Sequence, residues 1–177
     1  MDVEERLKDV FKCLYVIERD TGDIYLKMSK SLEDPLLSLT FKWISNESLN
    51  HAELLQTVLK RYFNVDVLSE DLSLCYRDLG ELGEVVKQIY ERLLPKEKLT
   101  ARDVFDVLSF LDLIELNTGE ELYSKLVIPL AKTIMLKHVK VEGDIEAKIL
   151  SELFNSIAKE EENHEKFVKL IKTYLTT

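Results

Sequence analysis

Apolar residues recur every three or four positions along most of this 177-residue chain, and few residues interrupt the pattern. Only five glycines and three prolines occur, whereas a protein of short strands needs a turn every roughly 8–12 residues and uses more of both. Long uninterrupted periods are typical of long helices, so the sequence predicts an all-α fold. Because the length is that of one domain, residues 1–177 are expected to form a single domain.

The first two helices are predicted to form an antiparallel hairpin over residues 2–63. The apolar period covers residues 2–33 and resumes at Pro35, a residue type that fits the first turn of a helix. The second helix is expected to end near Phe63. Two long helices joined by so short a link must fold back on each other.

A second hairpin is predicted over residues 101–175. Thr100 followed by Asp103 is typical of a helix N-cap with an acidic first turn. The elements expected after the first hairpin are a long crossover over 64–100 with an extra short helix at about 80–94, a helix over 101–138 and a helix over 144–175. Four long helices with one crossover predict a four-helix bundle.

The charge balance and the cysteines limit the function classes. Asp and Glu number 33 against 24 Lys and Arg, and the net charge of −9 argues against nucleic-acid binding. No apolar run is long enough to span a membrane, and the acidic N-terminus does not resemble a secretion signal. Cys13 and Cys75 stand singly among apolar residues, so we expect buried free thiols and a cytoplasmic location.

An internal repeat relates the two predicted hairpins. The matching segments are IERDTGD at 17–23 with IELNTGE at 114–120, and ISNESLNH at 44–51 with IAKEEENH at 157–164. The repeat aligns three pairs of residues: Glu18 with Glu115, Glu47 with Glu160, and His51 with His164. Each predicted hairpin therefore carries a glutamate on one helix and a histidine opposite it on the other.

These residue types suit a metal site. Carboxylates and neutral imidazoles bind divalent first-row metal ions, and residues three or four apart share one face of a helix. Glu18 and Glu115 interrupt apolar runs, and a buried carboxylate needs a partner, either a metal ion or a basic side chain. One Glu from each of two helices, with Glu-x-x-His from each of the other two, forms a metal cage in a bundle core.

With the motifs VIERDTGD, ISNESLNHAELL, LIELNTGE and IAKEEENHEKF, the chain resembles the ferritin-like di-iron carboxylate proteins, in particular the ferritin-like domain of rubrerythrin and its erythrin relatives. The resemblance covers residues 5–62 and 101–175. It implies a ferritin-like four-helix bundle that holds two metal ions. The ligands that it implies are Glu18 and Glu115 as the lone glutamates, Glu161 and His164 as one Glu-x-x-His, and His51 as the other histidine.

The sequence departs from the family pattern at Ser48, which stands where the first Glu-x-x-His has its glutamate. Glu47 lies four residues before His51 and is the candidate to replace the missing carboxylate. Glu160 occupies the same register before His164 and is the corresponding substitute for Glu161. The alternatives are an asymmetric site, a site with one metal ion, or no metal at all.

The resemblance implies a di-iron oxidoreductase that acts on peroxide, oxygen or ferrous iron, with manganese or zinc as alternative metals. The chain lacks the Cys-x-x-Cys pairs of a rubredoxin domain, so electrons would come from a separate donor protein. The alternative from a different class is a metal-free helical bundle that serves as an interaction or structural protein. A homodimer is a further expectation, because bundles of this size often pair through an exposed helical face.

Several neighbouring residues have less specific interpretations. Trp43 and Tyr123 are expected to serve core packing rather than electron transfer or hydrogen bonding to a ligand. Thr21 and Gly22 follow Glu18 on the same helix face. These small residues either leave room above the carboxylate or mark a duplicated helix kink.

Overall fold

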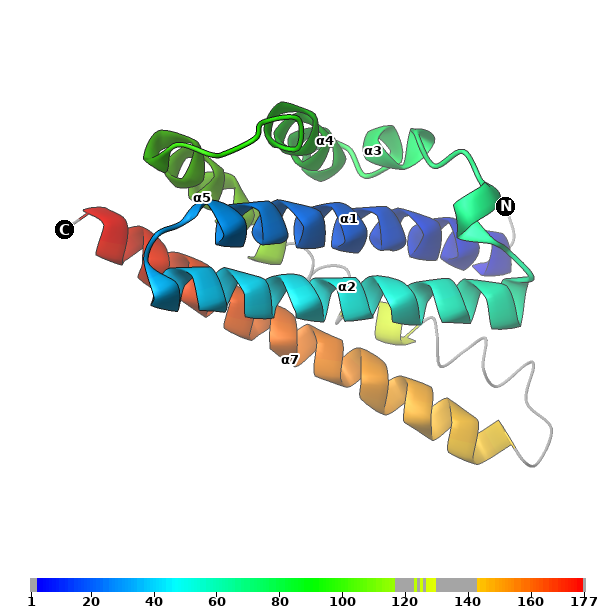
Figure 1. The fold of residues 1–177 in the computed structure, drawn as a ribbon. Helices are drawn as coiled ribbons and strands as arrows, with labels where there is room; N and C mark the ends of the chain where they lie inside the picture. The colour runs from blue at the N-terminus through cyan, green and yellow to red at the C-terminus, as the bar shows by residue number, and fades with distance from the viewer. Residues whose placement is uncertain (1–2, 117–122, 124, 126, 130–142, 177) are drawn as a thin grey trace.

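The computed structural model describes residues 3–116, 123, 125, 127–129 and 143–176, and their regular secondary structure is entirely helical (Figure 1). The predicted all-α class is confirmed. None of the helices in this described part of the chain has the length and apolarity needed to cross a bilayer.

The first predicted hairpin is confirmed. Helix α1 covers Val3–Ser31 and helix α2 covers Pro35–Phe63, and the two pack side by side along their length (Figure 1). The carboxylate of Asp34 accepts hydrogen bonds at 2.9 and 3.0 Å from two backbone N–H groups in the first turn of α2. Asn64 ends α2 in the left-handed conformation, with φ of 53°.

Gly22 allows α1 and α2 to approach closely. A Cβ atom at this position would lie 2.9 Å from Leu49 Cγ and 3.3 Å from the carbonyl oxygen of Ser45. The Ser45 hydroxyl donates a hydrogen bond of 2.8 Å to the carbonyl of Gly22. The space beside Gly22 is therefore occupied by α2, and the glycine serves helix packing.

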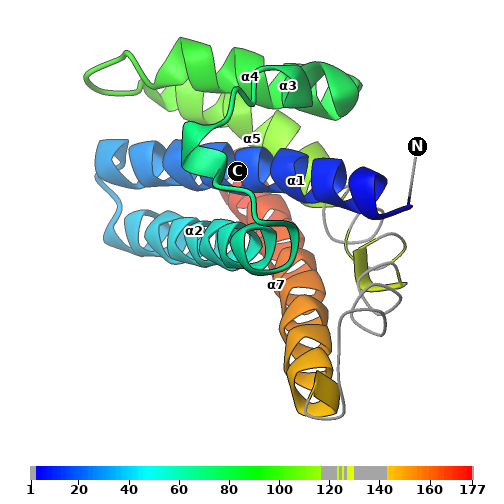
Figure 2. The same ribbon diagram turned by 90° about the vertical axis from the view of Figure 1, so that its right-hand side faces the viewer.

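The crossover contains more structure than the sequence analysis predicts. The expected short helix is confirmed as α4, Glu81–Leu93, which packs on α1 (Figure 2). Two shorter elements precede it, the 3₁₀ helix η1 at Val67–Ser69 and helix α3 at Leu74–Asp78. These were missed because elements of three to five residues carry too few apolar positions to show a period.

Helix α3 is attached to α1 by a covalent bond and by buried polar contacts. Cys13 and Cys75 form a disulfide with a Cα–Cα distance of 4.8 Å. The expectation of two free thiols is therefore wrong. The buried carboxylate of Asp20 accepts hydrogen bonds from the Tyr76 hydroxyl and, at 2.7 Å, from Arg19 Nε. Asp20 lies two residues after Glu18, on the opposite side of α1.

The second pair of long helices comprises α5, Ala101–Leu116, and α7, Gly143–Thr176. Thr100 and Asp103 form the predicted capping box, in which each side chain accepts a hydrogen bond from the backbone N–H of the other, at 3.0 and 3.2 Å. The rest of the predicted third helix falls mostly on residues outside the described part of the chain. Helix α7 packs against α5 and crosses α2 (Figure 2).

A layer of buried polar residues separates two apolar clusters. On α1, the first cluster includes residues up to Val16 and the second starts at Ile17. The buried polar residues at the boundary come from α1, α2 and α7, and they are Glu18, Ser45, Ser48, His51, Glu161 and His164. The molecule thus places charged groups at the middle of its core, where their burial has a cost unless they find partners.

Candidate metal centre

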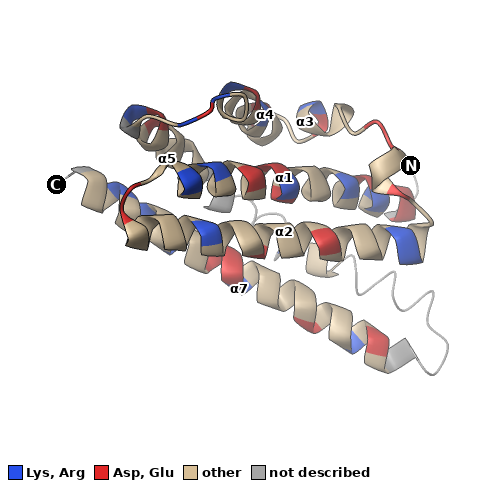
Figure 3. Ribbon diagram, viewed as in Figure 1, with Lys and Arg blue, Asp and Glu red and all other residues tan. Residues whose placement is uncertain are grey.

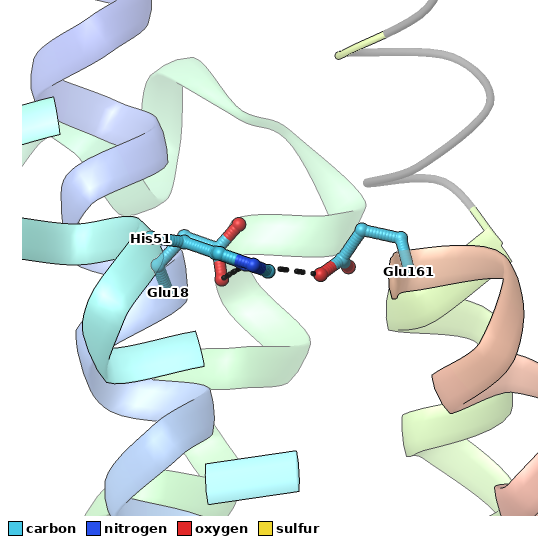
Figure 4. A group of neighbouring side chains, drawn as sticks. All are labelled: Glu18, His51 and Glu161. Atoms are coloured by element: carbon cyan, nitrogen blue, oxygen red, sulfur yellow. Dashed lines mark hydrogen bonds and ion pairs between the residues drawn. The ribbon is translucent and has the colours of Figure 1, made fainter. Parts of the chain in front are cut away.

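Three side chains from three helices meet in this polar layer. Glu18 on α1, His51 on α2 and Glu161 on α7 are each at most 3% exposed. One ligand atom from each lies within 4.8 Å of the others, and Figure 4 shows the imidazole between the two carboxylates. We call this group the Glu18–His51–Glu161 cluster. Two carboxylates and one imidazole are a donor set that divalent metal ions accept.

The inner nitrogen of His51 points at both carboxylates. His51 Nδ1 lies 3.3 Å from Glu18 Oε2 and 3.3 Å from Glu161 Oε1. Glu161 Oε1 is buried and accepts no hydrogen bond of ordinary geometry from the described residues. A buried carboxylate oxygen without such a bond is costly in a metal-free protein, and it is suited to accept a cation.

The second histidine approaches the same glutamate. His164 is fully buried, and its Nδ1 lies 3.5 Å from Glu161 Oε1. The rings of His51 and His164 are stacked with centroids 6.2 Å apart. Glu161 therefore lies between two imidazoles that both direct Nδ1 towards it.

The outer nitrogen of each histidine contacts a glutamate on the other helix, so the two Glu–His pairs are exchanged between α2 and α7. His51 Nε2 lies 2.7 Å from Glu160 on α7, and His164 Nε2 lies 2.9 Å from Glu47 on α2. Each glutamate lies four residues before one histidine and pairs with the other. A carboxylate on one ring nitrogen makes that nitrogen the donor, which leaves Nδ1 as the nitrogen with a lone pair for a metal ion.

Tyr123 completes the surroundings of Glu18. Its hydroxyl, fully buried, donates a hydrogen bond of 2.7 Å to Glu18 Oε1. The expectation that Tyr123 only packs in the core is therefore wrong. The signal that was available is its position eight residues after Glu115, but nothing in the sequence shows that this side chain reaches α1.

The buried charges of the cluster shift one another's protonation. Burial raises the pKa of Glu18, and the nearby charge of Glu161 raises it further. Burial lowers the pKa of His51, but the charge of Glu18, the hydrogen bond with Glu160 and the contact with Glu161 outweigh this effect and hold the pKa well above its usual value. Burial raises the pKa of Glu161, but its contacts with His164 and His51 lower it overall. The metal-free cluster thus favours a positive charge at its centre.

The structure brings together four of the predicted ligands: Glu18, His51, Glu161 and His164. Glu47 and Glu160, the predicted substitutes, lie instead at the outer histidine nitrogens. The backbone of Glu115 lies on α5, but its side chain is outside the described residues. Ser48, three residues before His51, is buried in the same layer.

Comparison of the chain with protein-family models, with curated protein sequences and with solved structures finds no significant match. The functional argument therefore depends on the residues of the polar layer and on their geometry.

Proposed function

We propose that the polar layer binds divalent metal ions and that the chain is a ferritin-like di-iron oxidoreductase. The observation that carries the proposal is the Glu18–His51–Glu161 cluster, whose two buried carboxylates face one imidazole nitrogen. Among the described residues, no lysine or arginine forms an ion pair with either carboxylate. In the metal-free protein, the protonated His51 is therefore the basic group that pairs with both buried glutamates, and a metal ion would take its place.

We propose two ions rather than one. Glu161 lies near both His51 Nδ1 and His164 Nδ1, so Glu161 and His51 would hold one ion and Glu161 and His164 would hold the other. Glu18 would complete the shell on the His51 side, and Glu115, its counterpart in the repeat, is proposed for the His164 side. A second shared carboxylate is absent at Ser48, so we expect the two positions to differ in affinity.

A pair of iron ions in such a site would supply two-electron chemistry with oxygen, peroxide or ferrous iron as the substrate. The residues of this chain would hold that pair and shield it from water. Tyr123 orients Glu18, while Glu47 and Glu160 orient the two histidines. The apolar clusters on both sides of the layer exclude bulk water. The choice among these substrates is made by analogy with ferritin-like folds.

Metal analysis tests the proposal directly. Protein produced with added iron would be measured by plasma mass spectrometry beside a His51→Ala/His164→Ala variant. The matched control is His138→Ala, because His138 is the third histidine and has no counterpart in the repeat. We expect about two metal ions per chain, retained in the control and lost in the double variant. Peroxide consumption and ferrous iron oxidation by the loaded protein would then be assayed.

Other metal contents have defined meanings. About one ion per chain would show that Ser48 leaves one position too weak to fill. A metal content no higher than in the double variant would contradict the proposal. It would favour the alternative function, a metal-free interaction or structural protein, in which the exchanged Glu–His pairs only satisfy buried polar groups.

A further inference from the structure

The proposed metal ligands are closed off from solvent. Glu18, His51, Glu161 and His164 are each at most 3% exposed. A metal ion from solution can therefore reach them only by passing other side chains. An ion that leaves water needs replacement ligands along the way, because a bare charge in an apolar interior is very costly. The protein thus needs an entry route that is lined by polar groups.

Two glutamates lie between these ligands and the solvent. The side chain of Glu160 on α7 is 38% exposed, and that of Glu47 on α2 is 20% exposed. Each contacts one of the buried histidines. The two carboxylates of the Glu18–His51–Glu161 cluster, by contrast, are 3% exposed. We call Glu47 and Glu160 the outer glutamates.

The opposite side of the molecule is covered. Helix α3 is attached to α1 by the Cys13–Cys75 disulfide and by the hydrogen bond from Tyr76 to Asp20. Helix α4 also packs on α1 (Figure 2). An ion that arrived from this side would have to displace both helices. At the crossing of α2 and α7, the outer glutamates are already in contact with solvent.

The histidines connect the outer glutamates to the cluster. Their Nε2 atoms lie 2.7 Å from Glu160 and 2.9 Å from Glu47. Their Nδ1 atoms lie 3.3 and 3.5 Å from Glu161 Oε1. That oxygen is buried and accepts no hydrogen bond of ordinary geometry from the described residues. Oxygen and nitrogen donors therefore follow one another from two partly exposed carboxylates to a buried one.

The charge at this crossing suits a cation. Residues 159–166 contain four glutamates and two lysines, and the whole chain carries a net charge of −9. Figure 3 shows acidic residues on α7 where this helix passes α2. A negative surface of this kind concentrates cations from solution and increases the rate at which they associate.

We propose that the outer glutamates form the entry site for divalent metal ions, at which an arriving ion first binds before it passes between α2 and α7 to the cluster. This inference rests on the proposed function, because it assumes that the cluster binds metal. It gives Glu47 and Glu160 a second role beside the orientation of the histidines. The outer glutamates determine how fast the site fills, and the buried ligands determine how tightly it holds the ion.

The rate of metal uptake tests this role. The metal-free protein would be mixed with Co²⁺, and its binding would be followed by stopped-flow absorbance. Release would be followed after addition of excess EDTA. The variant is Glu47→Gln/Glu160→Gln, which removes both charges but keeps an oxygen that can accept a hydrogen bond from each histidine. We expect the association rate constant to fall about tenfold.

The association rate separates entry from orientation. A residue that only orients a histidine strengthens the final complex, so its loss increases the release rate and leaves the association rate unchanged. The matched control is Glu53→Gln/Glu162→Gln, because Glu53 and Glu162 are exposed glutamates on the same two helices. The control loses the same charge and should take up Co²⁺ at nearly the wild-type rate. Equal association rates in the two variants would overturn the entry site.

Salt provides a second readout. Increasing NaCl should slow Co²⁺ uptake by the wild-type protein, because salt screens the attraction between the ion and partly exposed carboxylates. The slope should be smaller in Glu47→Gln/Glu160→Gln. An equal slope in both proteins would show that the outer glutamates do not attract the ion, which would contradict the proposal.

Failure of the entry site differs from failure of the proposed function. If the wild-type protein bound no Co²⁺ at any concentration tested, both proposals would be refuted. If the wild-type protein and both variants bound Co²⁺ at the same rate, only the entry site would be refuted. The melting temperatures of the metal-free variants, measured beside that of the wild type, verify that a slower rate does not come from unfolding.

Discussion

At the scale of single residues, the polar layer is organised by glutamates that hold the histidines from outside. His51 pairs through Nε2 with Glu160, and His164 pairs through Nε2 with Glu47. These contacts decide which ring nitrogen faces the Glu18–His51–Glu161 cluster. Partners of this kind orient a metal ligand and raise its basicity without touching the ion.

Removal of Glu160 should therefore weaken metal binding without removing a ligand. We expect Glu160→Ala to lower the affinity for the metal about tenfold, measured by competition of Zn²⁺ or Mn²⁺ with a chelating dye. The matched control is Glu162→Ala, because Glu162 is exposed and lies two residues away. If Glu160→Ala abolished binding altogether, Glu160 would be a direct ligand and the exchanged arrangement would not persist in the loaded protein.

The raised pKa of His51 predicts opposite pH trends for the metal-free and metal-loaded proteins. The proton on His51 stabilises the folded metal-free protein fully below the unfolded-state pKa of about 6.5. This stabilisation is lost as the pH rises through the higher folded-state pKa. Metal binding requires the deprotonated ring, so stabilisation by metal should increase over the same range.

Melting temperatures measured between about pH 6 and pH 9, with a chelator and with Zn²⁺, would show these trends. The His51→Ala variant is the control and should lose both. A metal-free melting temperature that does not fall with pH, or that falls equally in the variant, would contradict the assignment to His51.

At the scale of helices, packing is closest where α1 and α2 meet at Gly22. Leu49 and the Ser45 carbonyl occupy the space that a side chain at this position would need. Alanine is a better helix former than glycine. Replacing an exposed glycine in a helix with alanine therefore usually stabilises the protein. Here the crowding is expected to dominate.

We expect Gly22→Ala to lower the free energy of unfolding by about 1 kcal/mol, measured by urea denaturation. A double-mutant cycle with Leu49→Ala isolates the cause, because removal of the leucine side chain creates room for the new methyl group. The two substitutions should then cost less together than the sum of their separate effects. A stabilised Gly22→Ala variant would show that α2 shifts without strain.

At the scale of the whole molecule, a covalent link connects distant parts of the chain. The Cys13–Cys75 disulfide joins α1 to α3 across a separation of 62 residues. A cross-link over a loop of this length restricts the unfolded chain more than the folded one. The network of Asp20, Arg19 and Tyr76 holds the same two helices together and remains when the disulfide is removed.

Loss of the disulfide should accordingly destabilise the protein without unfolding it. We expect Cys13→Ala/Cys75→Ala to lower the free energy of unfolding by about 4 kcal/mol, measured by guanidinium denaturation beside the oxidised and reduced wild-type protein. The reduced wild-type protein should match the variant. Equal stability of all three samples would show that the two sulfur atoms are not bonded in solution.

Local patterns in the sequence were sufficient to predict the long helices of the first hairpin and the start of α5. The apolar period, Pro35 in the first turn of α2 and the Thr100–Asp103 capping box involve residues close together in the chain, so the sequence alone specifies them. The internal repeat also selected Glu18 and His51 as candidate ligands before any fold was known, and the resemblance to ferritin-like proteins added Glu161. These inferences succeeded because helix geometry converts spacing along the chain into position on a face.

Contacts between distant segments were decided only by the tertiary structure. The pairs His51–Glu160 and His164–Glu47 are separated by 109 and 117 residues. Such pairs depend on the register between helices, which no local pattern encodes. The same reason explains why the Cys13–Cys75 bond and the exposure of Trp43 differ from expectation. The sequence by itself determined which residues share a helix face, and helix packing determined which of those faces meet.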